Sequence, residues 1–106
     1  EAMAAATAAI LSDLKRLGLK FSRADLKIPV IETERGTNLL DASEDDLTST
    51  IVGLQTLRPL DWPCVMSTFE KMACTHILDL GPGTACASRS SRVLDHYRKG
   101  ISCICV

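Results

Sequence analysis

Apolar residues recur at intervals of three and four over the first part of the chain, which is the spacing of one face of an α-helix. This pattern predicts a helix over residues 2–17 that is ended by Gly18. Lys15 and Arg16 then lie in the last turn, where cations oppose the negative end of the helix dipole. The apolar face expected to be buried contains Met3, Ala6, Ile10, Leu14 and Leu17.

A short run rich in β-branched side chains, residues 26–32, predicts a strand. Pro29 has no backbone N–H, so this strand is expected at a sheet edge, at a strand start or at a bulge. A polar loop over residues 33–42 follows, with Gly36 and Asn38 as its turn-forming residues.

A second helix is predicted to begin with Ser43 as its cap and to end before Pro59. Three acidic residues, 44–46, would then lie in its first turn, where the helix dipole is positive. They also suggest a metal site, but consecutive carboxylates on a helix point in different directions, which favours the capping role. The predicted buried face contains Leu47, Ile51 and Leu54.

A third helix is predicted to start with Asp61 as its cap and Pro63 in its first turn. Its apolar residues recur at helical spacing, and we interpret them as a face that packs in the core. They are Trp62, Val65, Met66, Phe69 and Met72.

Residues 75–83 read Thr-His-Ile-Leu-Asp-Leu-Gly-Pro-Gly, which predicts a buried strand that stops at a glycine-proline-glycine corner. A helix over residues 85–99, ended by Gly100, and a strand over residues 101–106 follow. The order α-β-α-α-β-α-β predicts an α/β fold in which helices cover a parallel sheet. Because ligands of such folds bind beyond the carboxyl ends of the strands, the corner is the first candidate site.

Length and composition narrow the classes of protein. A chain of 106 residues is one small domain at most, and because Glu1 falls within a helical pattern we expect it to be a piece of a longer protein. The net charge of -1 favours neither a nucleic-acid nor a membrane partner, and no segment approaches the roughly 20 apolar residues of a membrane span. Five cysteines without paired spacing favour reduced thiols and a cytoplasmic location.

The reactive side chains lack the spacing that their chemistry needs, so we expect no metal site. Three cysteines and a histidine have no zinc-binding spacing: Cys64, Cys74, Cys86 and His76. Cys86 follows the corner, but Thr84 and Ser88 replace the glycines of a nucleophile elbow. The cysteines are therefore interpreted as buried structural residues, His76 as a core residue and His96 as a surface residue.

Residues 77–85, Ile-Leu-Asp-Leu-Gly-Pro-Gly-Thr-Ala, resemble motif I of S-adenosylmethionine-dependent methyltransferases, in which a strand ends in a glycine-rich turn beside the cofactor. Ala85 replaces the third glycine, and the last strand has no acidic residue to bind the ribose. A dinucleotide-binding fingerprint fails likewise, because Cys86 takes its third glycine position. This resemblance implies a methyltransferase-like cofactor domain, which stays open as an alternative.

Three segments in order resemble the closing third of an acyl-carrier-protein acyltransferase domain: residues 28–33, 59–63 and 75–83. The similarity is to the fungal type, namely the starter-unit acyltransferase of non-reducing polyketide synthases and the acetyltransferase region of the fungal fatty acid synthase β subunit. Residues 97–100, Tyr-Arg-Lys-Gly, are similar to the family's basic-glycine segment. The resemblance covers residues 1–106, which implies that the whole chain is the C-terminal portion of such a domain.

The resemblance implies transfer of a starter acyl group from coenzyme A or a carrier protein, through an ester or thioester on the enzyme, in polyketide or fatty acid synthesis. The family's nucleophile and catalytic histidine lie upstream of the segments matched here. The chain by itself is therefore expected to be inactive. The expected partners are an acyl carrier protein and the rest of a multidomain synthase, and the expected substrate is acyl-CoA or a phosphopantetheine-linked acyl group, with no tightly bound cofactor.

The resemblance also implies which residues border the active site. Gln55 matches a glutamine whose main-chain carbonyl supports the catalytic histidine in related malonyl transferases, although an exposed helical glutamine is the alternative. Gly81, Pro82 and Gly83 match the segment next to the substrate, whereas residues 84–88 depart from the family's glycine-rich continuation. A non-catalytic scaffold or carrier-docking piece remains a further alternative.

Overall fold

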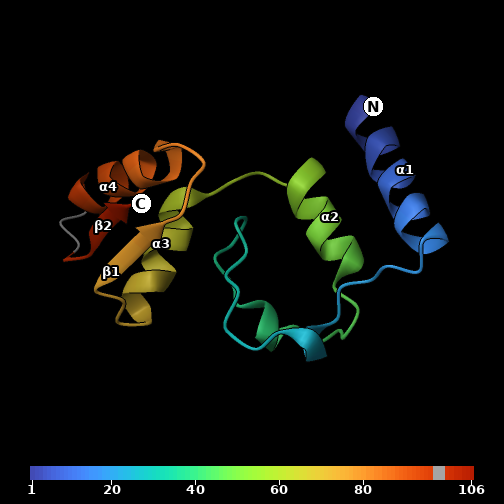
Figure 1. The fold of residues 1–106 in the computed structure, drawn as a ribbon, viewed down its shortest axis with the longest axis horizontal. Coiled ribbons are helices and arrows are strands. Elements are labelled where there is room, and N and C mark those ends of the chain that lie inside the picture. Colours follow the sequence, from blue (N-terminus) through green and yellow to red (C-terminus); the bar gives the residue numbers. More distant parts are fainter. Residues whose placement is uncertain (97–99) are drawn as a thin grey trace.

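The computed structural model describes residues 1–96 and 100–106. In this part of the chain four α-helices and two short 3-10 helices accompany a two-stranded parallel sheet, so the coarse α/β class is confirmed. The α-helices and strands in chain order are α1 (Ala2–Arg16), α2 (Thr48–Thr56), α3 (Trp62–Lys71), β1 (His76–Asp79), α4 (Ala85–His96) and β2 (Ser102–Cys105), and the 3-10 helices are Arg23–Asp25 and Leu39–Asp41. Figure 1 shows α1 beside α2 at one end, and α3, α4 and both strands at the other.

Helix α1 packs against α2 through a face other than the predicted one. Thr7 is buried, and its hydroxyl lies 2.7 Å from that of Thr56 on α2. Leu11 and Leu14 follow on the same face, whereas Met3 is 52% exposed, and Ile10 and Leu17 are exposed as well. The predicted stripe was therefore wrong except for Leu14, because an alanine-rich helix has more than one apolar face and periodicity does not say which of them meets a partner.

Residues 26–32 do not form the predicted strand. The segment folds back on the loop that follows, with one isolated antiparallel bridge between Ile31 and Asn38. The backbone N–H of Leu39 donates to the Val30 carbonyl, and the Asn38 side chain accepts from the Val30 N–H. These local bonds satisfy backbone groups that a neighbouring strand would otherwise pair, so β-branched composition alone was misleading.

Helix α2 begins five residues later than Ser43, so the predicted cap was wrong. The Asp46 carboxylate accepts the N–H of Thr48 at the start of α2. Asp45 instead accepts bonds from the Ser22 hydroxyl at 2.7 Å and from the Ala24 N–H at 3.1 Å, which hold the pKa of its carboxyl below the ordinary value. Asp45 thus ties the chain after α1 to the segment before α2, whereas Asp46 bonds the start of α2 itself.

Helix α3 starts as predicted, with Asp61 accepting the Cys64 N–H at 3.0 Å and Pro63 in the first turn. Val65 and Met66 form a buried cluster with Leu94 of α4. Trp62 adds a hydrogen bond from its indole N–H to the hydroxyl of Ser90, which is 1% exposed. This cluster is the core of the C-terminal half.

Strands β1 and β2 pair in parallel, with His76 opposite Ser102 and Asp79 opposite Cys105. Ile77 and Cys103 pack against the α3–α4 cluster, while Leu78, on the other face, is 58% exposed. The prediction of a buried strand was therefore wrong, because only one face of the sheet is covered. His76 is exposed and not in the core; its Nδ1 lies 2.9 Å from the Thr75 hydroxyl.

The last predicted helix is observed up to His96, and the predicted continuation over residues 97–99 lies outside the described residues, as does most of the basic-glycine segment. In the described ranges, no helix has the length and apolar character that crossing a bilayer requires.

Candidate functional site

The corner after β1 is organised by one carboxylate. Asp79, the last residue of β1, accepts the Gly81 N–H at 2.9 Å and the Ala87 N–H in the first turn of α4 at 2.7 Å. Gly81 and Gly83 have φ values of +75° and +77°, which side-chain-bearing residues rarely adopt. Asp79 thus fixes the turn and supplies a negative charge at the positive end of α4.

All three corner residues, Gly81, Pro82 and Gly83, are exposed at the carboxyl end of β1, as the sequence predicted for their position. A Cβ atom added to Gly83 would meet nothing within 4 Å. The backbone there is open to an approaching molecule. The last paired position of β2, opposite Asp79, is Cys105, so no acidic side chain occupies it. The Cys105 Sγ lies 3.7 Å from the Gly83 carbonyl.

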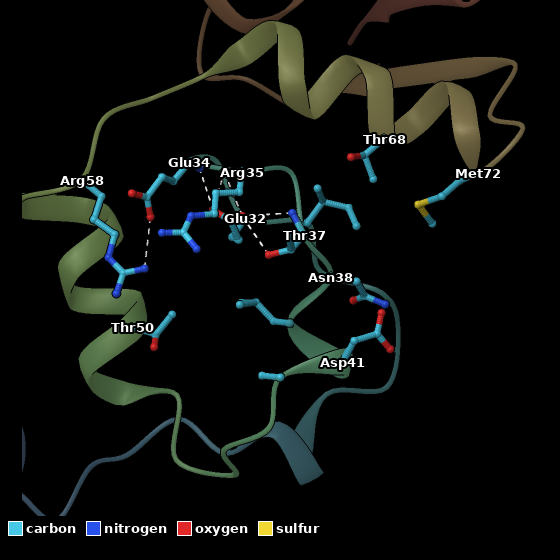
Figure 2. Close-up of a pocket in the computed structure, with 13 residues that line it drawn as sticks. Glu32, Glu34, Arg35, Thr37, Asn38, Asp41, Thr50, Arg58, Thr68 and Met72 are labelled. Carbon is cyan, nitrogen blue, oxygen red and sulfur yellow. Dashed lines mark hydrogen bonds and ion pairs between the residues drawn. The ribbon is translucent and has the colours of Figure 1, made fainter.

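A separate cleft of about 670 Å³ lies between the polar loop, α2 and the C-terminal part of α3 (Figure 2). Its size is typical of small-molecule sites. None of the three corner residues lines it. Its walls are formed by Ile31, Glu32, Glu34, Arg35, Thr37, Asn38, Leu39, Asp41, Ala42, Thr50, Arg58, Thr68 and Met72.

Glu32 organises the wall of this cleft. Its side chain accepts the backbone N–H groups of Glu34, Arg35 and Thr37, and the Thr37 hydroxyl, at 2.6 to 3.2 Å. The residue is only 7% exposed. Burial raises the pKa of the Glu32 carboxyl, but these hydrogen bonds outweigh burial and leave the pKa below its ordinary value. Glu32 is therefore an ionised structural residue that closes the turn.

Gly36 fixes the turn on α3. The Thr68 hydroxyl donates to the Gly36 carbonyl at 2.7 Å, and the Cys64 Sγ lies 2.9 Å from the Arg35 carbonyl. Gly36 has a φ of +66°, and a Cβ atom there would lie 2.7 Å from Thr68 Oγ1 and 2.9 Å from the Cys64 carbonyl oxygen. Only glycine fits this approach without a shift.

One end of the cleft carries the charged side chains. Arg58 forms an ion pair with Glu34 at 3.2 Å, and Figure 2 shows the Arg35 guanidinium directed to the same end. Throughout residues 1–96 and 100–106, no carboxylate is ion-paired with Arg35. Asn38 and Asp41 lie toward the opposite end.

Gln55 is exposed on α2 and lines a smaller groove of about 270 Å³. This groove runs between α2 and residues 30–33, and Leu39 and Glu32 border both hollows. The corner lies in the other half of the structure, beside α4 (Figure 1). The described residues thus do not bring Gln55 and the corner into one pocket.

The cysteines do not form a joint site. Cys86 and Cys105 are exposed and not buried as predicted, while Cys64, Cys74 and Cys103 are half-buried free thiols. Within the described ranges, no group of three or more histidine, cysteine, aspartate or glutamate residues is arranged to hold a metal ion.

The cleft and the place of Glu32, Arg35 and Arg58 in it were not predicted, because residues 26–32 were expected to form a strand and residues 33–42 a polar loop. The signal in the sequence was an acid followed by a glycine four residues later, Glu32 and Gly36, which is compatible with a side chain folded over its own turn.

Comparisons of the chain with protein-family models, with curated protein sequences and with solved structures find no match.

Proposed function

We propose that this chain is the C-terminal part of an acyl-carrier-protein acyltransferase domain of the fungal type. In this proposal the domain loads a starter acyl group from coenzyme A or a carrier protein in polyketide or fatty acid synthesis. It works in the cytoplasm beside an acyl carrier protein and the other domains of a synthase. The chain supplies a wall of the site, and the nucleophile and base come from elsewhere in the protein.

The observation that carries the proposal is the geometry of the corner. A parallel strand ends in two left-handed glycines around Pro82, and α4 then leads to the neighbouring strand. This is the place where α/β folds bind ligands. The exposed backbone at Gly83 leaves room for an acyl chain or a pantetheine arm, and Asp79 keeps the turn in place.

The 106-residue chain, incubated with radiolabelled acyl-CoA, is expected to acquire no covalent label. Its exposed thiol nearest the corner in sequence, Cys86, is not flanked by the glycines of a nucleophile elbow. The measurement is the stoichiometry of label after denaturation, with Cys86→Ser as the control. Stoichiometric label that disappears in Cys86→Ser would place the nucleophile in this chain and contradict the proposal.

In the intact protein, Gly83→Val is expected to slow acyl transfer to the carrier protein about tenfold or more. The valine side chain would either shift the backbone of the corner or fill the space next to the substrate. Gly18→Val is the matched control. Gly18 has a φ of +67° and, like Gly83, open space where a Cβ would lie, but it follows α1. Both variants should lower the melting temperature by similar amounts. Equal transfer rates in the two variants would show that the corner is only a strand terminator.

A further inference from the structure

The charged end of the 670 Å³ cleft is a second candidate binding site, distinct from the corner. Two guanidinium groups reach it from different segments: Arg35 from the polar loop and Arg58 from the chain just after α2 (Figure 2). Thr50 of α2 lines the same cleft, below Arg58 in the view of Figure 2. Guanidinium groups present several N–H donors in a planar fork that matches an oxyanion.

The two guanidinium groups at this end differ in what they already bind. Arg58 forms an ion pair with Glu34 at 3.2 Å, whereas Arg35 is exposed and has no ion-pair partner in the described ranges. The ionised Glu32 carboxylate is taken up by the backbone N–H groups of Glu34, Arg35 and Thr37. Arg35 is therefore the cation that a singly charged anion would pair with.

The rest of the cleft disfavours a second negative charge. The wall contains the ionised Glu32, and Asp41 lies toward the opposite end. The remaining lining includes Ile31, Leu39 and Met72, which offer apolar surface to the body of a ligand. A phosphate monoester carries nearly two charges at neutral pH, whereas a carboxylate carries one.

From this arrangement we propose that the cleft binds a singly charged organic carboxylate, with its head held by Arg35 and Arg58 and a short apolar body along Ile31 and Leu39. This inference does not rest on the proposed acyl transfer, and either can fail without the other. The site is already shaped without the ligand, because Glu32 and Gly36 hold the loop through backbone contacts.

The test is a titration of the isotope-labelled 106-residue chain with hexanoate, followed by NMR. We expect saturable shifts of residues around the cleft and a dissociation constant in roughly the millimolar range, as suits a ligand of few atoms. Hexanamide lacks the negative charge of hexanoate, whereas adipate and inorganic phosphate carry more negative charge than hexanoate does. All three should bind at least about fivefold more weakly.

Two substitutions should change the affinity in opposite directions. Arg35→Gln should weaken hexanoate binding about tenfold, and Glu34→Gln should strengthen it, because the competing carboxylate beside Arg58 is neutralised. Arg16→Gln is the matched control, since Arg16 lies on α1, pairs with Asp13 and does not line the cleft. Fold is retained in Arg35→Gln because residue 35 contacts Glu32 and Cys64 through its backbone.

The proposal is overturned if hexanoate gives no saturable shifts, or if hexanamide binds as tightly as hexanoate. It is also overturned if Arg35→Gln binds hexanoate as Arg16→Gln does, or if adipate or phosphate binds more tightly. Shifts confined to the cleft, lost in Arg35→Gln and enhanced in Glu34→Gln, would establish the site.

Discussion

Gly36→Ala is expected to lower the free energy of unfolding by about 3 kcal/mol. Roughly 1 kcal/mol of this is the cost of a side chain in the left-handed region, where Gly36 has a φ of +66°. The rest comes from overpacking, because the new Cβ would lie 2.7 Å from Thr68 Oγ1 and 2.9 Å from the Cys64 carbonyl oxygen. The Thr68 side chain can rotate away, but the backbone of α3 cannot.

Gly18→Ala is the control that separates the two contributions. Gly18 has nearly the same φ, +67°, and no atom within 4 Å of an added Cβ. Urea unfolding followed by circular dichroism should therefore give a loss of about 1 kcal/mol for Gly18→Ala and a clearly larger loss for Gly36→Ala. Equal losses would mean that the turn does not rest on α3, and the cleft would then lack its fixed wall.

Features set by neighbouring residues were predicted well. Asp61 with Pro63 fixes the start of α3, and the alternation of strand, helix and strand after residue 75 specifies the parallel pair β1–β2. The glycine-proline-glycine corner also lies where predicted, with φ values that require glycine. The α3 start and the corner are set by residues within one turn, and the strand pair is set by a single continuous strand-helix-strand unit.

Features set by distant residues were missed. The burial of Thr7 instead of Ile10 depends on α2, 49 residues away from Thr7 at Thr56. The strand expected at residues 26–32 is lost for a local reason instead, because the Asn38 side chain and the Leu39 N–H bond to Val30, eight and nine residues earlier.

The cleft could not be predicted from spacing either. Its charged end joins Arg35 of the loop to Arg58 after α2, and Gly36 meets α3 through Thr68, 32 residues later. Periodicity along the chain carries no information on such contacts.

Glu32→Gln is expected to lower the free energy of unfolding near pH 7 by about 2 kcal/mol. The buried carboxylate accepts three backbone N–H groups and one hydroxyl. An amide would turn an N–H donor toward some of these donors and leave buried groups unsatisfied. Asp13→Asn is the matched acid-to-amide control, because Asp13 pairs with Arg16 at the surface and should contribute almost nothing.

The loss of stability caused by Glu32→Gln should also depend on pH. The folded-state pKa of Glu32 lies below the ordinary value of 4.5, so the folded state holds the Glu32 proton less tightly than the unfolded state does. Its stabilising contribution is complete above about pH 5 and is lost as the pH falls through the folded pKa. The difference between wild type and Glu32→Gln should therefore shrink on acidification from pH 5 to pH 3, measured by urea unfolding at each pH.

Some acid sensitivity should persist in Glu32→Gln, because the carboxyls of Asp45 and Asp46 also have lowered pKa values, through bonds to Ser22 and Thr48 respectively. The informative quantity is thus the difference in the free energy of unfolding between wild type and Glu32→Gln, and not the pH dependence of either protein alone. A difference that stays constant from pH 7 to pH 3 would show that Glu32 acts through packing or shape, and the turn would not depend on an ionised carboxylate.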